Sequence, residues 1–210
     1  MERLISFPVF DHTTLSIMAA VASAVFVAEL TDKDALLILT LATKHRPWFV
    51  FAAASVTFTI TTAIIAVAGY FLVNVFPVYW IKIVGGVIMI CYGFWGFLRG
   101  SEKELAEEEK LLARTSLKSM WPAFLAVVSM LALLDLAGDA TEVLIIVFVA
   151  HFRNVVLVFV SALIGLIAAN ALETAVGNRL RNHLSLKKLR LFSLLVFTTI
   201  GTAIIITTVL

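Results

Sequence analysis

The feature that most constrains this chain is a series of six apolar stretches, each long enough to cross a membrane as a helix. A helix that rises 1.5 Å per residue needs about 20 apolar residues to cross about 30 Å of hydrocarbon. The stretches cover residues 13–43, 48–73, 79–98, 120–150, 155–176 and 189–209. The sequence therefore predicts an all-α integral membrane protein with six transmembrane helices, of which the first and fourth are unusually long.

The overall composition excludes a soluble domain. Hydrophobic residues make up 61% of the chain and charged residues 14%, whereas soluble domains have roughly half and a quarter. The single cysteine, Cys91, permits no intrachain disulfide. No basic segment carries interleaved aromatic residues, so we expect no nucleic-acid partner. The apolar composition indicates that the chain is embedded in a lipid bilayer.

The distribution of Lys and Arg predicts the orientation in the membrane. The loops after the first, third and fifth stretches hold twelve of the sixteen basic residues, and the opposite side holds three. Because basic residues accumulate in cytoplasmic loops, we expect the twelve-residue side to be cytoplasmic and both termini to be extracytoplasmic. We expect a multi-pass integral membrane protein of a bacterial or archaeal plasma membrane, in preference to an organelle membrane.

Acidic residues inside the apolar stretches are the second unusual feature. They are Glu29, Asp32 and Asp34 in the first stretch, Asp135, Asp139 and Glu142 in the fourth, and Glu173 in the fifth. Only Lys33 offsets these seven carboxylates, which leaves six formal negative charges. Unpaired charge in hydrocarbon is costly, so the carboxylates must be protonated, paired or bound to a cation.

The spacing within the two acidic patches predicts a shared cation site. Glu29 and Asp32 are three residues apart and share a helix face, whereas Asp34 points elsewhere unless the helix breaks there. Lys33 lies four residues beyond Glu29 and can pair with it. The second patch is spaced by four and three residues, which also places its carboxylates on one face. If the two patches face each other, their oxygens form a cage suited to Ca²⁺, Mn²⁺ or Mg²⁺.

An internal repeat relates the two patches. With a shift of 107 residues, Asp32 falls on Asp139, and TDKDALLILTLATKHR falls on GDATEVLIIVFVAHFR. Three spans in each half give the halves opposite orientations, and such inverted repeats are typical of secondary transporters with a site near the midplane. The expected units are residues 1–100 as the first three-helix repeat, 101–119 as a cytoplasmic linker helix, and 120–210 as the second three-helix repeat.

Three further polar residues are accessory candidates. Thr59 lies in the threonine-rich second stretch, where its hydroxyl could add an oxygen ligand, although bonding to its own helix is commoner. Asn170 and Glu173 are three residues apart in the fifth stretch and share a helix face. Glu173 is expected near the cytoplasmic end, where it could belong to the ion path, pair with Arg179 or reach water.

The patches carry two degenerate copies of a known motif, Glu-x-Gly-Asp-(Lys/Arg)-(Thr/Ser). The first copy reads Glu29-Leu-Thr-Asp32-Lys33-Asp34, and the second reads Leu-Ala-Gly-Asp139-Ala-Thr141. With these motifs and its span layout, the chain resembles the six-helix cation/proton exchangers of Golgi, chloroplast and bacterial membranes that handle manganese and calcium.

The resemblance implies that Glu29, Asp32 and Asp139 line the cation site. The second copy has Leu136 in place of the motif's glutamate, for which Asp135 or Glu142 would substitute, and Thr141 keeps its hydroxyl residue. Lys33 would be a counter-charge that limits cation affinity or selects the coupling state. The extra Asp34 and the missing basic residue at position 140 make this site more negative than the family pattern.

The function predicted from these observations is export of a divalent cation, Mn²⁺ or Ca²⁺, from the cytosol in exchange for protons. The transported cation and protons are substrates, and no resident cofactor is expected. Two alternatives stay open: an exporter of small organic cations or amino acids, and a passive cation channel. An enzyme is not expected, because the sequence offers no Ser/His pair, no metal-binding His pair and no phosphate loop. The sequence does not predict an oligomeric state.

Overall fold

The structure is a computed structural model, and its described part consists of helices joined by short turns. It describes residues 11–44, 46–99, 124–125, 127–129, 131–132, 139–181 and 186–210. The long helices are α1 (His12–Thr31), α2 (Lys33–Lys44), α3 (Pro47–Val75), α4 (Val78–Arg99), α7 (Ala140–Phe152), α8 (Val155–Arg181) and α9 (Leu186–Val209). The linker helix predicted for residues 101–119 lies outside the described residues.

The helices confirm the prediction of an all-α, multi-pass membrane protein. Five of the described helices are long and apolar enough to cross a membrane: α1, α3, α4, α8 and α9. The first predicted stretch is not one continuous helix, because it breaks at Asp32 into α1 and α2. Of the fourth stretch, the longest described piece is α7, an apolar helix of 13 residues.

Local chemistry accounts for several helix ends. Asp11 caps α1 by accepting a hydrogen bond from the Thr14 amide at 2.7 Å, and this bond holds the pKa of the Asp11 carboxyl below its ordinary value. Pro47 starts α3, where its missing N–H costs nothing. Arg153 closes α7 with φ 52°, the one positive φ among the non-glycine residues that the structure describes.

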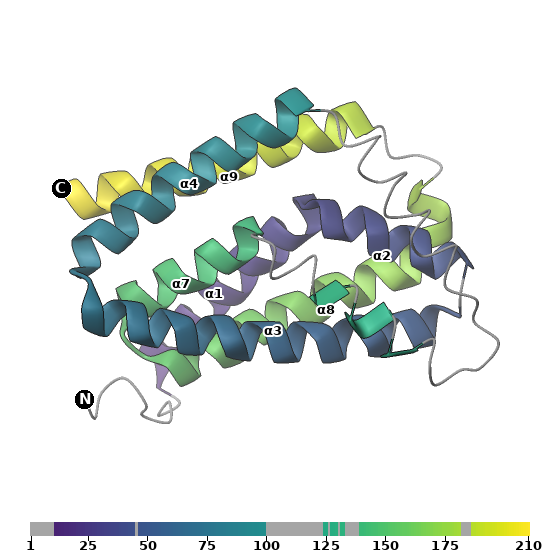
Figure 1. Ribbon diagram of the computed structural model, residues 1–210, viewed down its shortest axis with the longest axis horizontal. Coiled ribbons are helices and arrows are strands. Elements are labelled where there is room, and N and C mark those ends of the chain that lie inside the picture. Colours follow the sequence, from purple (N-terminus) through teal and green to yellow (C-terminus); the bar gives the residue numbers. More distant parts are fainter. Residues whose placement is uncertain are drawn as a thin grey trace.

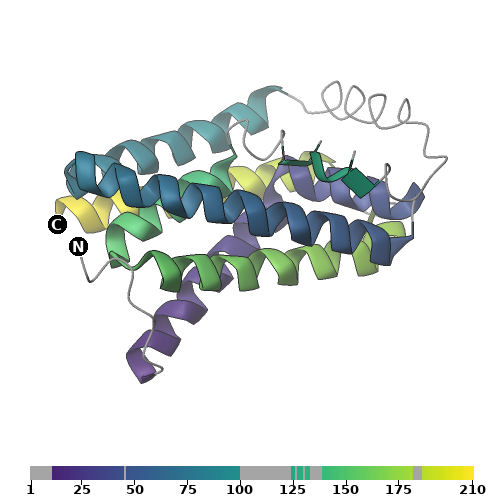
Figure 2. The ribbon, with the colours of Figure 1, turned by 60° about the horizontal axis from the view of Figure 1, so that its bottom comes forward.

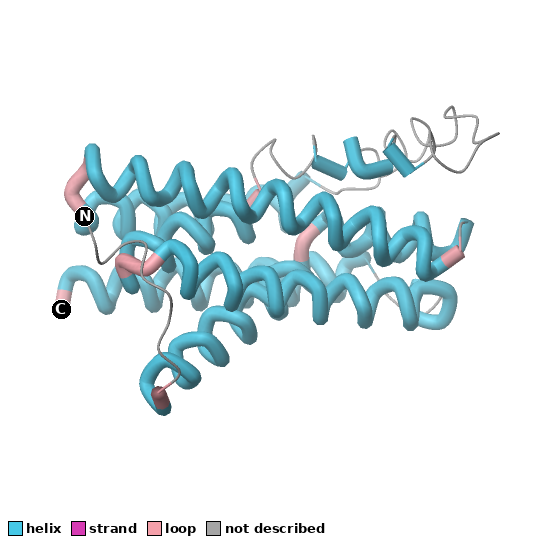
Figure 3. Tube along the Cα trace, turned by 90° about the horizontal axis from the view of Figure 1, so that it is seen from below, coloured by secondary structure: helices cyan, strands magenta, loops and turns pink. Residues whose placement is uncertain are grey.

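The helices run in opposite directions in the two halves of the chain. In Figure 1, α2 and α4 run toward the right end and α3 toward the left, whereas α7 and α9 run toward the left and α8 toward the right. The turns after α3 and α7 lie at the left end, together with the start of α1 and the end of α9. The N-terminal half of α1 projects from the bundle (Figures 2 and 3).

Glycines allow the closest helix contacts. At the crossing of α4 and α9, a Cβ added to Gly86 would lie 2.8 Å from the Gly201 carbonyl oxygen, so the two backbones nearly touch. Gly165 of α8 crosses α1 in the same way, against the backbone of Ala22 and Phe26. Small residues at such crossings are the usual means of packing helices in lipid, where apolar burial gives little driving force.

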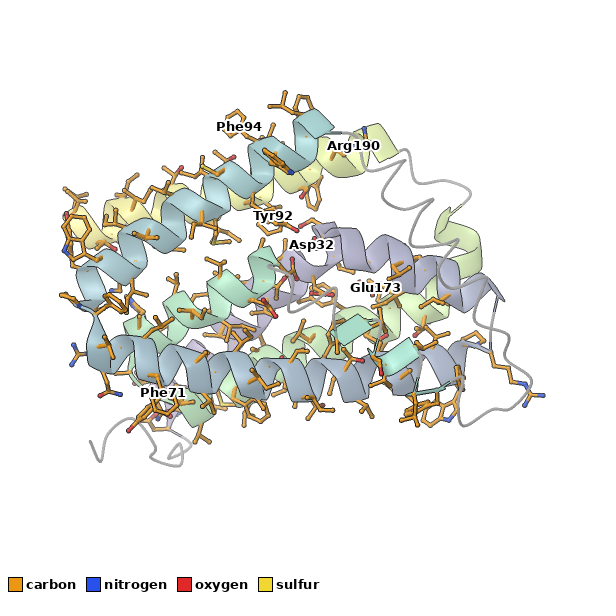
Figure 4. The ribbon with its side chains drawn as sticks, in the orientation of Figure 1. Asp32, Phe71, Tyr92, Phe94, Glu173 and Arg190 are labelled. Atoms are coloured by element: carbon orange, nitrogen blue, oxygen red, sulfur yellow. The ribbon has the colours of Figure 1, made fainter. Side chains whose placement is uncertain are left out.

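Large apolar side chains cover the outside of the bundle. Phe71 of α3 and Phe94 of α4 point outward and are 61% and 50% exposed (Figure 4). Cys91 is also exposed, in agreement with a lipid-facing position. Buried polar residues gather instead in the interior, among them four acidic side chains from α1, α7, α8 and the residue before α2, with a fifth, Asp139, directly before α7.

Candidate functional site

The site is built around the break between α1 and α2. Asp32 leaves the helical conformation with φ −83° and ψ 167°, and its backbone N–H donates to the Glu29 carbonyl at 3.0 Å. Its side chain is 2% exposed. A break inside a membrane segment places a carboxylate, a helix C-terminus and a helix N-terminus at one point, as in many transporter binding sites.

Thr31 occupies the position where the family motif has glycine. Its hydroxyl donates to the Ala28 carbonyl at 2.8 Å, and its backbone stays in the helix. Glycine is required where φ is positive, and Thr31 has no positive φ. The backbone therefore explains why threonine is accepted here.

Asp139 occupies the matching place in the second half of the chain. It precedes α7 with φ −95° and ψ 151°, close to the backbone conformation of Asp32 before α2. Its side chain is 1% exposed, and Glu142 follows in the first turn of α7, also buried. The two aspartates that the repeat aligns thus take the same local position, each directly before a helix.

A hydrogen bond joins the two motifs. The Thr141 hydroxyl on α7 donates to Oε2 of Glu29 on α1 at 3.3 Å, across 112 residues of sequence. Glu29 is buried and belongs to the first motif, whereas Thr141 is the hydroxyl residue of the second. The first and second motifs are therefore in contact inside the bundle.

Tyr92 is a site residue that the sequence analysis missed. Its hydroxyl, on α4, donates to Oδ1 of Asp32 at 3.3 Å, and Figure 4 shows the tyrosine above the aspartate in the interior. The available signal was its position: Tyr92 lies inside the apolar stretch 79–98, away from the span ends where Tyr79 and Trp80 are explained by the membrane interface.

The accessory candidates on α8 lie on the inside of the bundle. Glu173 is 1% exposed, and neither of its carboxyl oxygens forms a hydrogen bond within the described residues. It interacts electrostatically with Asp32, and Figure 4 shows both side chains in the interior. Surrounding helices cover Glu173 in this structure, so its carboxylate does not lie on the surface of the described bundle. The Arg179 side chain lies outside the described residues.

Asn170 joins α8 to α3. Its amide nitrogen donates to the Phe51 carbonyl and to the Ser55 hydroxyl, both at 3.0 Å, and its side chain is fully buried. Its carbonyl oxygen Oδ1 has no hydrogen-bond partner within the described part of the chain. Asn170 therefore tethers α8 to α3 and keeps a buried carbonyl oxygen close in sequence to Glu173.

Thr59 is not brought to the site. It lies on the exposed side of α3, and its hydroxyl donates to the Ser55 carbonyl of the same helix at 2.7 Å. The buried hydroxyls of α3 belong to Thr57, Thr61 and Thr62. Thr57 also donates within its own helix, to the Ala53 carbonyl at 3.0 Å, as membrane threonines commonly do.

The expected cage of carboxylates is not closed among the described residues. Within the described ranges, no group of three His, Cys, Asp or Glu side chains is close enough to hold a metal ion. Like-charged carboxylates repel one another, and hydroxyls from Thr141 and Tyr92 take two of the oxygens instead. The side chains of Lys33 and Asp34, and all of Asp135, lie outside the described residues.

Comparison with known proteins gives a family. A family model described as "Divalent cation/proton antiporter GDT1" matches residues 17–104 and 123–209. The chain belongs to this family. The membership confirms the resemblance read from the motifs and makes the chain a transporter of divalent cations and protons, not an enzyme. No curated protein and no solved structure matches the chain.

Proposed function

We propose that this antiporter exports Mn²⁺ or Ca²⁺ from the cytosol in exchange for protons, at a site formed by both motifs. The observation that carries the proposal is the 3.3 Å hydrogen bond from Thr141 to Glu29, which puts the second motif against the first. Carboxylate oxygens are the ligands that these hard cations prefer, and the site supplies several.

In this proposal the motif residues have distinct roles. Asp32 and Asp139 are the central ligands, because each lies at a helix start inside the bundle. Glu29, Asp135 and Glu142 are further ligands or proton carriers. Asp34 adds negative charge, and Lys33 offsets part of it.

Two buried polar residues of α8, Glu173 and Asn170, extend the proposed site. Glu173 interacts with Asp32, so a proton or cation bound at one carboxylate changes the charge that the other experiences. Oδ1 of Asn170 is buried and lies one helical turn before Glu173 on α8. We assign Glu173 and Asn170 an accessory role in the ion path, and we leave Thr59 out of the site.

Competition for the carboxylates couples the two fluxes. A divalent cation binds only deprotonated carboxylates, so its binding releases protons, and protons arriving from outside displace the cation. An inward proton gradient then drives export. The direction follows from the basic loops, which assign the end bearing the turn between α2 and α3 to the cytoplasm.

We further propose that the two halves form an inverted repeat, with three spans in each half. Among the described helices, three of the first half run opposite to a counterpart in the second: α2 to α7, α3 to α8, and α4 to α9 (Figure 1). The matching backbone of Asp32 and Asp139 supports the same relation. An inverted pair gives two equivalent arrangements, one open to each side, which alternating access requires.

The test is flux into proteoliposomes with Mn²⁺, Ca²⁺ and Mg²⁺ under an imposed proton gradient. We expect Mn²⁺ or Ca²⁺ to move, and Asp32→Asn and Asp139→Asn each to reduce its flux at least tenfold. Asp11→Asn is the matched control, since it makes the same change at the exposed cap of α1 and keeps the cap. Normal transport by both site variants would remove the proposed site.

A further inference from the structure

Tyr92 is the residue of α4 that reaches the acidic site, and no motif includes it. Its hydroxyl lies 3.3 Å from Oδ1 of Asp32. A carboxylate offers about four lone-pair positions, so one hydrogen bond at Oδ1 leaves positions for a cation on the same group. The tyrosine can therefore hold Asp32 without occupying the place of the transported ion.

The ring of Tyr92 is fixed by α9. Phe197 packs edge-on against it, with ring centroids 5.7 Å apart and an interplanar angle of 84°, and Phe197 itself is fully buried. At the next residue of α4, a Cβ added to Gly93 would lie 3.3 Å from the Leu194 carbonyl oxygen, so the helices are close there as well. The α4–α9 pair thus sets where the hydroxyl points.

The hydrogen bond from Tyr92 reaches Asp32 from a different helix. Asp32 lies at the break between α1 and α2, where its backbone is extended. Hydrogen bonds from outside the coordination sphere orient ligating carboxylates, and their loss commonly weakens metal binding by about 10- to 100-fold.

We propose that Tyr92 is a positioning residue for cation recognition, which orients the Asp32 carboxylate from the α4–α9 pair. This inference rests on the proposed function, because it takes Asp32 as a ligand. It assigns α4 and α9 a part in the affinity of a site whose acidic residues lie on other helices. A shift of this pair relative to α1 would change the hydrogen bond and with it the cation affinity.

The test compares Tyr92→Phe with Tyr79→Phe on the same helix. Tyr92→Phe removes one oxygen and keeps the ring against Phe197, whereas Tyr79 is 48% exposed at the start of α4. With Mn²⁺ as the probe, we expect Tyr92→Phe to raise KM about tenfold with kcat within about threefold. Tyr79→Phe should leave both unchanged.

A second measurement separates orientation from packing. The Mn²⁺ concentration that protects the purified protein against thermal unfolding should rise about tenfold in Tyr92→Phe, while the unfolding temperature without Mn²⁺ stays near that of the unmodified chain. An unchanged KM, or a fall in kcat alone, would overturn the proposal. If Asp32→Asn abolishes flux and Tyr92→Phe is normal, only this inference fails. If Asp32→Asn transports normally, the proposed function fails first.

Discussion

The contact between the motifs allows a quantitative prediction for Thr141→Val. Valine keeps the shape of threonine and removes the hydroxyl that donates to Oε2 of Glu29. Interhelical hydrogen bonds in membranes average about 0.6 kcal/mol and reach about 1.7 kcal/mol. The acceptor is a buried carboxylate, which strengthens the bond, but 3.3 Å is long for an O–H···O contact. We therefore expect a coupling energy of about 1 kcal/mol between the two side chains.

The assay is a double-mutant cycle of Thr141→Val and Glu29→Leu, each of which removes one partner of the hydrogen bond, with free energies of unfolding measured in mixed micelles. Thr59→Val is the control, because Thr59 is exposed and its hydroxyl bonds only within α3 among the described contacts. That control should change stability by less than about 0.5 kcal/mol. A coupling energy indistinguishable from zero would refute the contact between the motifs.

Three other predictions test the helix packing and the outer surface of the bundle. Gly86→Ala should destabilise the chain by about 1–3 kcal/mol, because its methyl group would meet the Gly201 carbonyl. Gly96→Ala is the control, because the space around Gly96 is open and the change should have little effect. Thermal unfolding compares the two variants. Asn170→Leu should cost about 1–3 kcal/mol by removing two hydrogen bonds to α3, measured in the same way. Cys91→Ser should transport normally, because Cys91 is exposed on the outside of the bundle. In membranes, the Cys91 thiol should resist a charged thiol reagent if it faces lipid. Rapid labelling would contradict the lipid-facing position.

The sequence predicted the five long apolar helices that the structure shows and located the acidic motifs, because both depend on composition over short distances. Apolar length defines a membrane helix, and carboxylates inside such a segment stand out against it. The break at Asp32 was one of two alternatives that the spacing of Asp34 left open, and the structure selects it. The sequence left open whether the two motifs face each other, and the Glu29–Thr141 hydrogen bond shows that they are in contact.

The direction in which single side chains face was harder to predict. A helix that is apolar all round carries no amphipathic signal, so nothing in α3 marked Thr57 as buried and Thr59 as exposed. Tyr92 was missed because a tyrosine in an apolar run resembles a lipid-facing one, although its position away from the span ends was a signal. Glu173 was expected near the end of its span, but α8 continues to Arg181 and keeps the carboxylate inside.

The central claim is that cation and proton movements are coupled at one site. The most direct measurement is simultaneous recording of Mn²⁺ uptake and internal pH in proteoliposomes at zero membrane potential, without an imposed proton gradient. We predict that Mn²⁺ uptake drives protons out in a fixed ratio, and that Asp32→Asn abolishes both movements together. Mn²⁺ uptake without proton efflux would contradict the account and would identify a passive channel instead.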